Sequence, residues 1–255
     1  MEKEIIVAEK NNLVPNPPEM FVIRGRRQDD NELEIQDIFL QLRKIIDIKD
    51  TVTFQIRLPL ESNAKRFFKR SIDLFFSSII IIGALSWLMP LLALIIKLDS
   101  KGPVFFVQNR NKRNGDVFKC IKFRSMVENA EADSMPATFD DERITRVGKF
   151  LRRTFLDELP QFFNVWIGDM SLIGPRPHMI SDNHRYVELI DFYDYRHKVK
   201  PGITGLSQVL GYIGETRNLI AMKNRVQLDI FYVRHWSFWL DLKITWFTLR
   251  KIAGL

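Results

Sequence analysis

The chain has 255 residues, of which 46% are hydrophobic, and it carries a formal net charge of +7. This length and apolar content allow the core of one sizeable domain, or of one domain with an appendage, and exclude a wholly disordered chain. The single cysteine, Cys120, excludes an internal disulfide and a cysteine-rich metal site, which fits a reducing compartment.

The charge is unevenly distributed along the chain. Residues 1–63 hold 9 Lys and Arg against 12 Asp and Glu, a balance of −3, and the remaining residues hold 29 against 19, a balance of +10. We expect the basic part to have an anionic partner, which could be nucleic acid, an anionic bilayer surface or a phosphorylated substrate.

Two elements are predicted near the start of the chain. The segment LEIQDIFLQLRKIIDI at 33–48 has the spacing of an amphipathic helix, and TVTFQIRL at 51–58 alternates like a strand. Residues 1–12 mix acids and lysines with a short apolar run, so we expect no signal peptide there. We assign residues 1–64 to an N-terminal extension that packs on the rest of the chain or binds a partner.

A long apolar run follows this extension. From Leu74 to Ile96 the chain reads LFFSSIIIIGALSWLMPLLALII, 23 residues without one charge. About 20 apolar residues suffice to cross a bilayer as a helix, and a soluble core helix is seldom so long and so uniformly apolar. The run therefore predicts insertion into a membrane.

The flanks of the run bear on whether the inserted helix crosses the bilayer. Basic residues both precede and follow it, which by the positive-inside rule places both ends on the cytoplasmic face. Pro90, with Gly83 and Ser86 nearby, offers a point where the helix can break. We favour a helix over 72–98 that enters and returns, and a straight, proline-kinked span remains the alternative. The flanking cations are Lys65, Arg66, Lys69 and Arg70 before the run, and Lys97, Lys101, Arg110, Lys112 and Arg113 after it.

The rest of the chain has the pattern of a mixed α/β domain. Val104–Val107 and Val117–Phe123 are short apolar runs joined across Asn114 and Gly115, a pair typical of hairpin turns. The polar segment at 129–141 is predicted to form a helix and a loop.

A helix is predicted close to the end of the chain. Trp239 and Trp246 fall on one helical face together with Lys243 and Arg250. Tryptophan and basic side chains on one face suit a bilayer interface, where rings lie at headgroup level and cations meet lipid phosphate. Packing of the two tryptophans in an ordinary core is the alternative.

Two adjacent acids stand in an apolar setting within RTFLDELPQFFNVWIGDMSLIGPRP at 153–177. Proline is tolerated in a first helical turn, so Pro160 predicts a helix that starts at about Asp157 and ends near Gly168. Asp157 and Glu158 then lie at the positive end of the helix dipole, which keeps carboxylates ionised.

Ionised carboxylates at this place have two chemical uses. One can be a nucleophile toward phosphorus, and one can bind Mg²⁺, which is held through one or two carboxylates and substrate phosphates. Simple helix capping is the alternative. Arginine forks match phosphate oxygens, and the basic residues that could bind phosphate are Lys122, Arg124, Arg152 and Arg176, although a solvated basic face explains any one of them.

Several other kinds of site are not indicated. The sequence has no Walker loop, no GxGxxG and no zinc-ligand spacing, and its four histidines show no metal spacing. A nucleic-acid partner is not expected, because the basic residues flank a membrane segment and no binding motif for nucleic acid accompanies them.

Several ordered motifs carry a resemblance to a known family. From about Lys65 to Leu255 the sequence resembles the bacterial sugar transferases, which are monotopic polyprenyl-phosphate phosphoglycosyl transferases. It leaves residues 1–64 uncovered. The motifs are KRSIDLFFSS at 69–78, GPVFFVQNR at 102–110, KFRSM at 122–126, RITRVGKFLRRTFLDELPQFFNVWIGDMSLIGPRP at 143–177, KPGITGLSQV at 200–209 and LDIFYVRHWSFWLDLKI at 228–244.

The resemblance implies roles for particular residues. Asp157 would be the nucleophile, and Glu158 would help to hold Mg²⁺. The membrane break would lie at Pro90, which follows Met89 where some members have a serine, so the local chemistry of the bend departs from theirs. The residues implied to bind the substrate and its phosphates are Lys122, Arg124, Arg152, Asp169 and Arg176.

The resemblance also implies a fold and a reaction. We expect a helix-rich α+β monotopic membrane protein, with a re-entrant helix-break-helix and a transferase domain over 65–255 on the cytoplasmic face of the bacterial inner membrane. The domain would transfer a sugar 1-phosphate from a UDP-sugar to polyprenyl (undecaprenyl) phosphate through an aspartyl intermediate, releasing UMP. This would be the first membrane step of exopolysaccharide, O-antigen, capsule or glycoprotein glycan assembly. An inactive membrane-bound scaffold is the alternative, and a homodimer is left open.

Overall fold

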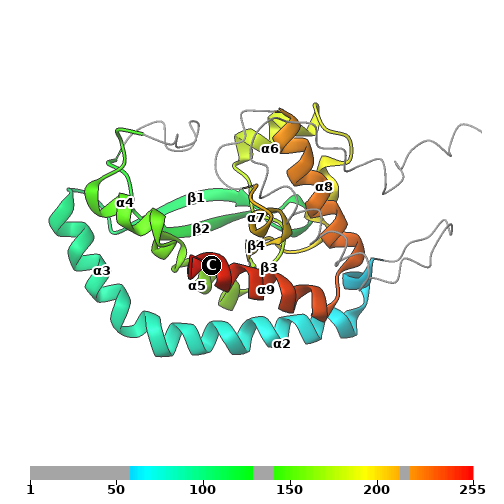
Figure 1. The fold of residues 1–255 in the computed structure, drawn as a ribbon, viewed down its shortest axis with the longest axis horizontal. Helices are drawn as coiled ribbons and strands as arrows, with labels where there is room; N and C mark the ends of the chain where they lie inside the picture. The colour runs from blue at the N-terminus through cyan, green and yellow to red at the C-terminus, as the bar shows by residue number, and fades with distance from the viewer. Residues whose placement is uncertain (1–57, 129–140, 213–218, 255) are drawn as a thin grey trace, which may run out of the picture. The chain divides into compact units, whose positions relative to one another are not determined.

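The computed structural model describes residues 58–128, 141–212 and 219–254, which belong to one compact unit, Val52–Leu255 (Figure 1). The elements predicted at 33–48, 51–58 and 129–141 fall almost wholly outside these residues, as does most of the predicted extension at 1–64. The described part is a helix-rich α+β fold with two small sheets, as the sequence predicts.

A single long helix opens the described part of the chain. It consists of α2 (Asn63–Ile80), a π-helical turn (Ile81–Leu85) and α3 (Ser86–Asp99). Among the described residues, this is the one helix long and apolar enough to cross a membrane. The prediction of a long apolar helix is thus confirmed, although the helix runs from 63 to 99 rather than from 72 to 98.

The predicted break at Pro90 is wrong in one respect, because the chain stays helical there. Pro90 lies inside α3, and the irregular segment is the π-helical turn just before that helix. Proline removes a backbone hydrogen bond, and apolar helices tolerate this loss when nearby turns and side chains adjust. Ser86 Oγ and Trp87 Nε1 donate to the carbonyls of Ile82 and Gly83, at 2.6 and 3.0 Å. The helix bends in this region without ending (Figure 1).

The first arm of the long helix is fixed to the rest of the unit by buried polar contacts. The Asp73 carboxylate accepts from Ser171 Oγ and from the Leu172 backbone amide, each at 3.0 Å. Lys69 Nζ lies 2.6 Å from Asp241 Oδ2 in α9 (Phe238–Ile252). Because an unpaired charge is costly to bury, these contacts fix both the rotation and the position of α2.

The second arm is held by apolar packing against the same unit. Leu92 and Ile96 of α3 are 4% and 2% exposed and form one cluster with Phe123 and Leu151. Full burial of such a side chain stabilises a fold by about 1.5–3 kcal/mol. Both arms of the helix therefore contact the same body. Helix α5 (Gln161–Ile167) and strand β3 (Ser171–Ile173) pack against α2, and helix α4 (Arg146–Arg153) packs against α3.

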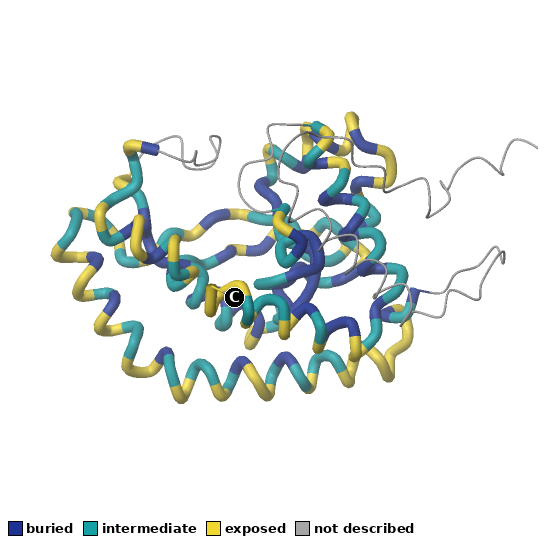
Figure 2. The backbone as a smooth tube through the Cα atoms, viewed as in Figure 1, coloured by how far each residue is buried: buried dark blue, intermediate teal, exposed yellow. Residues whose placement is uncertain are grey.

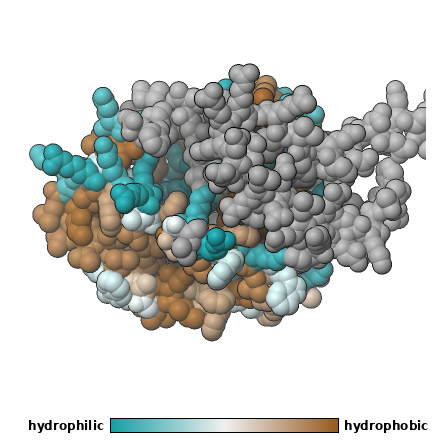
Figure 3. Space-filling model, in the orientation of Figure 1, coloured by the Kyte–Doolittle hydropathy of each residue, from teal (hydrophilic) through white to brown (hydrophobic). Residues whose placement is uncertain are grey.

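The opposite side of the long helix is left bare. Apolar side chains stay exposed along both arms, and they form a brown band along the lower edge of the surface in Figure 3. Figure 2 shows the same alternation, with exposed positions on the outer side of the helix and buried positions on the inner side. Exposed apolar surface on this scale marks a contact with a membrane or another protein. It includes Phe67, Phe75, Ile82, Trp87, Leu94 and Leu98.

Two small sheets lie within the unit. Strands β1 (Phe105–Asn111) and β2 (Val117–Phe123) pair antiparallel, with the left-handed Asn114 (φ 63°) in their connection, which confirms the predicted hairpin and lengthens its first strand. Strands β3 (Ser171–Ile173) and β4 (Gly202–Thr204) pair parallel. A β-carbon on Gly202 would lie 2.1 Å from the Gly174 nitrogen, so only glycine allows this approach.

Helices complete the unit around these sheets. The connections between them include short 3₁₀ turns at Pro59–Glu61, Leu156–Glu158 and Tyr193–Lys198. A second apolar cluster joins β2 to α5 through Phe118, Cys120, Val165 and Met170. The helices are α4 (Arg146–Arg153), α5 (Gln161–Ile167), α6 (Ile180–Val187), α7 (Leu206–Val209), α8 (Leu219–His235) and α9 (Phe238–Ile252).

The last helix resolves the question of the two tryptophans. Trp239 and Trp246 of α9 are 66% and 61% exposed, so they do not pack in the core. The Phe238 ring lies 5.5 Å from the Phe68 ring of α2. The exposed face of α9 thus adjoins the bare side of the long helix, as an interfacial helix would.

Gly148 fixes the position of α4 relative to the segment after β2 that contains Ser125. A β-carbon at Gly148 would lie 1.9 Å from the Ser125 carbonyl oxygen, a backbone atom that cannot move without displacing the chain. We expect Gly148→Ala to lower the free energy of unfolding by about 3 kcal/mol. Chemical or thermal denaturation of the detergent-purified protein measures this loss.

The matched control is Gly83→Ala, because nothing lies within 4 Å of the corresponding β-carbon position in the long helix. Alanine favours a helix over glycine by about 1 kcal/mol, so this variant is expected to be as stable as the parent or slightly more so. A Gly148→Ala protein as stable as Gly83→Ala would contradict the close packing of α4.

Candidate active site

The two acids lie in a 3₁₀ turn rather than in the first turn of a longer helix. The turn spans Leu156–Glu158, and α5 begins only at Gln161, after Pro160. Phe155 precedes the turn with φ at 58°, a left-handed conformation that costs a non-glycine residue about 1–2 kcal/mol. This residue reverses the chain after α4 and turns the acids toward β2. The expected helix end at Gly168 is found, with φ at 107°.

Glu158 is held from two sides. Lys122 Nζ of β2 lies 2.7 Å from its Oε1, while Arg176 Nη2 and Nη1 lie 2.6 and 3.1 Å from Oε1 and Oε2. Burial alone would raise the pKa of Glu158, but the charges of Arg176 and Lys122 outweigh it and hold that pKa well below its usual range. Glu158 is therefore ionised and fixed in direction.

The Asp157 carboxylate, in contrast, has no hydrogen-bond partner among the described residues. The side chain of Asp157 is buried. Burial raises the pKa of Asp157, and the adjacent Glu158 adds to the rise, while Lys122, Arg152 and Arg176 oppose it. A carboxylate without hydrogen bonds in a cationic setting keeps its lone pairs available, which a nucleophile requires.

Arg152 supplies a further positive charge near Asp157. It stands in the last turn of α4, and its Nε donates to Ser125 Oγ at 2.8 Å, which leaves its terminal nitrogens free to turn to a ligand. Burial lowers the pKa of Arg152, and the charges of Asp157 and Asp141 oppose that change. The structure thus brings together five of the residues chosen from the sequence: Lys122, Arg152, Asp157, Glu158 and Arg176.

The other two residues of that set are placed elsewhere. Arg124 is buried and donates to the carbonyls of Lys101 and Ser100, so it caps the end of α3. Asp169 is paired with Lys112 Nζ at 2.8 Å, beyond the end of α5. Neither contact is with the acid pair, and a substrate-binding role for these two residues stays a prediction.

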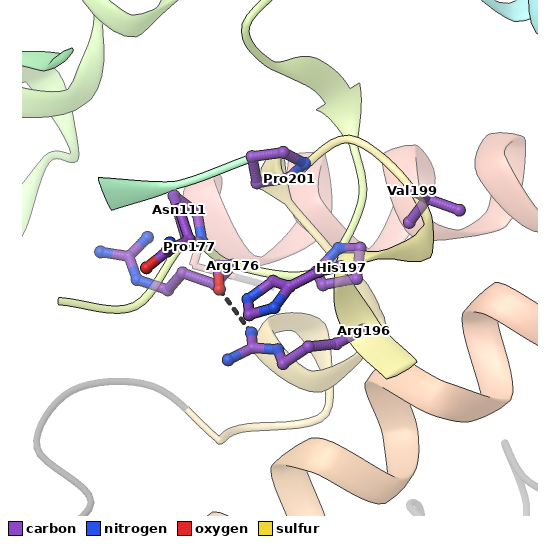
Figure 4. A pocket seen from close by; sticks show the side chains of 8 residues that line it. Asn111, Arg176, Pro177, Arg196, His197, Val199 and Pro201 are labelled. Atoms are coloured by element: carbon purple, nitrogen blue, oxygen red, sulfur yellow. Dashed lines mark hydrogen bonds between the residues drawn. The ribbon is translucent and has the colours of Figure 1, made fainter. Parts of the chain in front are cut away.

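A buried network that sequence patterns did not reveal supports Arg176. Arg196 is 2% exposed and donates to the Arg176 carbonyl oxygen at 2.5 Å (Figure 4). It also pairs with Asp229 at 2.8 Å. The cavity beside this contact has about 10 Å³, room for one water molecule and not for a substrate. The network therefore positions the loop that carries Arg176. Its residues lie far apart in the sequence, and no spacing rule would have joined them.

The chemistry available at this site follows from these charges. Lys122, Arg152 and Arg176 outnumber the two acids, so the site suits an anion such as a diphosphate. The described residues contain no group of three or more His, Cys, Asp or Glu side chains that would hold a metal alone. Mg²⁺ needs only one or two carboxylates when substrate phosphates supply further ligands, and the adjacent acids meet that requirement.

Comparison with known proteins agrees with this chemistry. The family model described as Bacterial sugar transferase matches residues 64–254. The chain belongs to this family. One similar protein is the UDP-glucose:undecaprenyl-phosphate glucose-1-phosphate transferase of Klebsiella pneumoniae, 51% identical over 185 residues, which cover 72% of this chain and 40% of that protein.

Two further relatives show how widely the similarity extends. The UDP-N-acetylgalactosamine-undecaprenyl-phosphate N-acetylgalactosaminephosphotransferase of Aeromonas hydrophila is 40% identical over 220 residues, covering 82% of this chain and 51% of that protein. The exopolysaccharide production protein PSS of Rhizobium leguminosarum is 42% identical over 189 residues, covering 71% of this chain and 92% of that protein. The chain spans about two fifths of the length of the Klebsiella relative.

The opposite states of the two acids give opposite effects on stability. Since the pKa of Asp157 is raised, its contribution to stability is favourable only at acidic pH and is lost as the pH rises through that pKa. Since the pKa of Glu158 is lowered, its contribution is present at neutral pH and is lost as the pH falls below the ordinary glutamate range. At pH 7 we expect Asp157→Asn to stabilise by up to about 1 kcal/mol and Glu158→Gln to destabilise by about 2 kcal/mol.

Thermal unfolding of both variants and the parent at pH 7 and at pH 4 measures these effects. The two variants are matched, because each replaces one carboxylate by its amide within one turn. Equal shifts of the same sign at pH 7 would contradict the assignment of a free Asp157 and a clamped Glu158.

Proposed function

We propose that the protein transfers a sugar 1-phosphate from a UDP-sugar to undecaprenyl phosphate, with a covalent aspartyl phosphosugar as the intermediate. The printed names of the relatives from Klebsiella and Aeromonas describe this transfer for glucose and for N-acetylgalactosamine. The observation that carries the proposal here is the contrast between adjacent acids, one clamped by Lys122 and Arg176 and one without a hydrogen-bond partner among the described residues.

The first step uses Asp157 as a nucleophile. Its carboxylate oxygen forms a bond to the β-phosphorus of the UDP-sugar, and the bond from that phosphorus to the bridging oxygen breaks. UMP leaves with the bonding electron pair, and the sugar phosphate stays on Asp157. Arg152 and Arg176 lie where they can stabilise the charge that develops on the phosphoryl oxygens.

The second step returns the enzyme to its starting state. A phosphate oxygen of undecaprenyl phosphate forms a bond to the same phosphorus, and the bond to Asp157 breaks. The carboxylate is restored, and the product is a lipid-linked diphosphosugar. Splitting the transfer in two lets a water-soluble donor and a membrane-bound acceptor use one site in turn.

Mg²⁺ fits the same site as the cofactor of this reaction. Glu158 would hold it through Oε2, which accepts only from Arg176 and keeps one lone pair, whereas Oε1 accepts from both Lys122 and Arg176. The adjacent Asp157 could share the ion before the attack. When bound, the ion neutralises negative charge on the diphosphate. Lys122 and Arg176 then keep the Glu158 carboxylate ionised and aimed in one direction.

The proposed place of action is the cytoplasmic face of the bacterial inner membrane. Two features support a re-entrant long helix: both of its arms pack on one body, and basic residues flank both of its ends. Lys65 and Lys101 are among these exposed flanking cations. A re-entrant helix would hold the acid pair near the headgroups, where the acceptor phosphate lies.

The nucleotide that leaves distinguishes this reaction from its alternatives. Attack at the β-phosphorus releases UMP, whereas an ordinary glycosyltransferase releases UDP and an inactive scaffold releases neither. With Mg²⁺ and the accepted UDP-sugar, we expect a burst of UMP of up to one equivalent per site before lipid is added, and a protein mass increased by one sugar phosphate. Quenched-flow nucleotide analysis and intact-protein mass spectrometry measure the two.

Asp157→Asn is the decisive variant for this burst, since its amide cannot attack phosphorus. We expect it to lose both the burst and the mass gain, while Glu158→Gln forms the intermediate at least a hundredfold more slowly, the equivalent of about 3 kcal/mol. Release of UDP, or a normal burst from Asp157→Asn, would refute the two-step mechanism.

The topology has its own test. Single cysteines replace the exposed Ala64 and Asp116, one before and one after the long helix, in a Cys120→Ser background. A membrane-impermeant maleimide is expected to label neither position in intact cells and both after permeabilisation, because both ends would face the cytoplasm. Labelling of one position alone in intact cells would establish a helix that crosses the bilayer.

A further inference from the structure

A second group of cations surrounds the end of α5, away from the acid pair. Gly168 ends this helix with φ at 107°. A β-carbon on Gly168 would stand 3.4 Å from Arg70 Nη2 and also 3.4 Å from Lys200 Nζ. The side chains of Arg70 and Lys200, which are far apart in the sequence, therefore both lie close to Gly168.

Two further basic residues belong to this group. Lys112 Nζ pairs with Asp169 Oδ1 at 2.8 Å, directly after Gly168. Arg113 follows Lys112 in the chain, and beyond the effect of burial its charge, like that of Arg70, lowers the pKa of Lys200, while Asp73 and Asp169 oppose this change. We call Arg70, Lys112, Arg113 and Lys200 the α5-end cation group. Arg70 and Lys200 lie at the end of α5, whereas Asp157 and Glu158 precede its start, so this group is distinct from the candidate active site.

The members of the group differ in how fully they are paired. Arg70 donates to the carbonyls of Val165 and Trp166 and thereby caps α5. Among the described residues, Arg113 and Lys200 have no hydrogen-bond or salt-bridge partner, and Arg113 Nε is buried without one. Lys200 is half-buried, and burial followed by the charge of Arg70 lowers its pKa. The four cations outnumber the two carboxylates that act on Lys200, Asp73 and Asp169, so the group keeps a positive balance that favours an anion.

Exposed apolar residues next to the α5-end cation group indicate what kind of anion binds there. Trp166 and Ile167, just before Gly168, are 51% and 64% exposed, and Trp166 Nε1 donates to Ser78 Oγ on the long helix. Arg70 itself stands on α2, one turn after Phe67, which is 77% exposed. The group thus lies at the edge of the bare apolar side of the molecule. Phosphate beside apolar chains is the chemistry of a lipid headgroup.

We propose that Arg70, Arg113 and Lys200 bind the phosphate of an anionic membrane phospholipid, at a site separate from the one that carries out the transfer. The inference rests on the membrane association proposed above and on no part of the transfer chemistry. Bound there, the lipid would neutralise the cation group and would fix the end of α5 at headgroup depth. Trp166 and Ile167 would pack against the acyl chains of the same lipid.

Native mass spectrometry of the detergent-released full chain tests the proposal. The protein is supplied with mixed micelles that contain phosphatidylglycerol or phosphatidylcholine, and the number of retained lipids is counted. We expect the parent protein to retain one phosphatidylglycerol in preference to phosphatidylcholine. Each cation removed is expected to weaken this retention about fivefold, the equivalent of about 1 kcal/mol, so that Arg113→Gln with Lys200→Gln weakens it about 25-fold.

The matched control is Lys198→Gln, which removes an exposed lysine two residues from Lys200 and outside the group. We expect this control to retain phosphatidylglycerol as the parent does, and thermal unfolding verifies that the double variant is folded. Equal retention by the double variant and the parent would overturn the proposal. So would displacement of the lipid by inorganic phosphate, since that result would identify a site for soluble phosphate.

The same samples separate this inference from the proposed function. UMP release by the double variant in detergent is expected to match that of the parent, because neither Arg113 nor Lys200 touches the acid pair. Loss of lipid retention with normal UMP release supports the lipid site. A parent protein that retains the lipid but releases no UMP would refute the transfer reaction and leave the lipid site standing.

Discussion

The site depends on one interaction, the salt bridges that Arg176 and Lys122 form with the Glu158 carboxylate. It joins three segments that are distant in the sequence: β2, the 3₁₀ turn and the loop before α6. Because both Glu158 oxygens are engaged, the turn cannot rotate, and Asp157 next to it is held in place without a bond of its own. The buried pair of Arg196 and Asp229 fixes the loop from behind. Asp157 is thus held rigid by its neighbours, and its own oxygens stay free of hydrogen bonds.

The long apolar helix is likewise held in place by polar contacts with its neighbours. Polar side chains on the inner side of α2 end on buried acceptors or donors, while its outer side stays apolar and exposed. Asp241 alone accepts from Lys69, Tyr232 and Trp236, and so joins α2, α8 and the start of α9. Charges within a long apolar helix are costly, and here Lys69, Arg70 and Asp73 serve to attach the helix to the rest of the protein.

Sequence patterns predicted the parts of this structure that depend on local chemistry. The uncharged run predicted the apolar helix, and Asn114 with Gly115 predicted the hairpin, since each signal lies within one short segment. The ordered motifs predicted the family. The start of α5 was placed four residues too early, because Pro160 is equally compatible with a 3₁₀ turn and an α-helix. Arg196 and Asp229 could not be paired from the sequence, because their contact depends on how α8 packs on the loop.

The π-helical turn at Ile81–Leu85 has a consequence for how the long helix tolerates change in length. A π turn holds one residue more than an α turn, and each residue of an α-helix rotates the chain by about 100°. The buried residues of α2 and those of α3 therefore face the same side of the helix only when that extra residue is present. Deleting a single residue there would straighten the helix into a regular one and swing Leu92 and Ile96 away from Phe123 and Leu151. The number of residues in this turn is thus constrained separately from their identity.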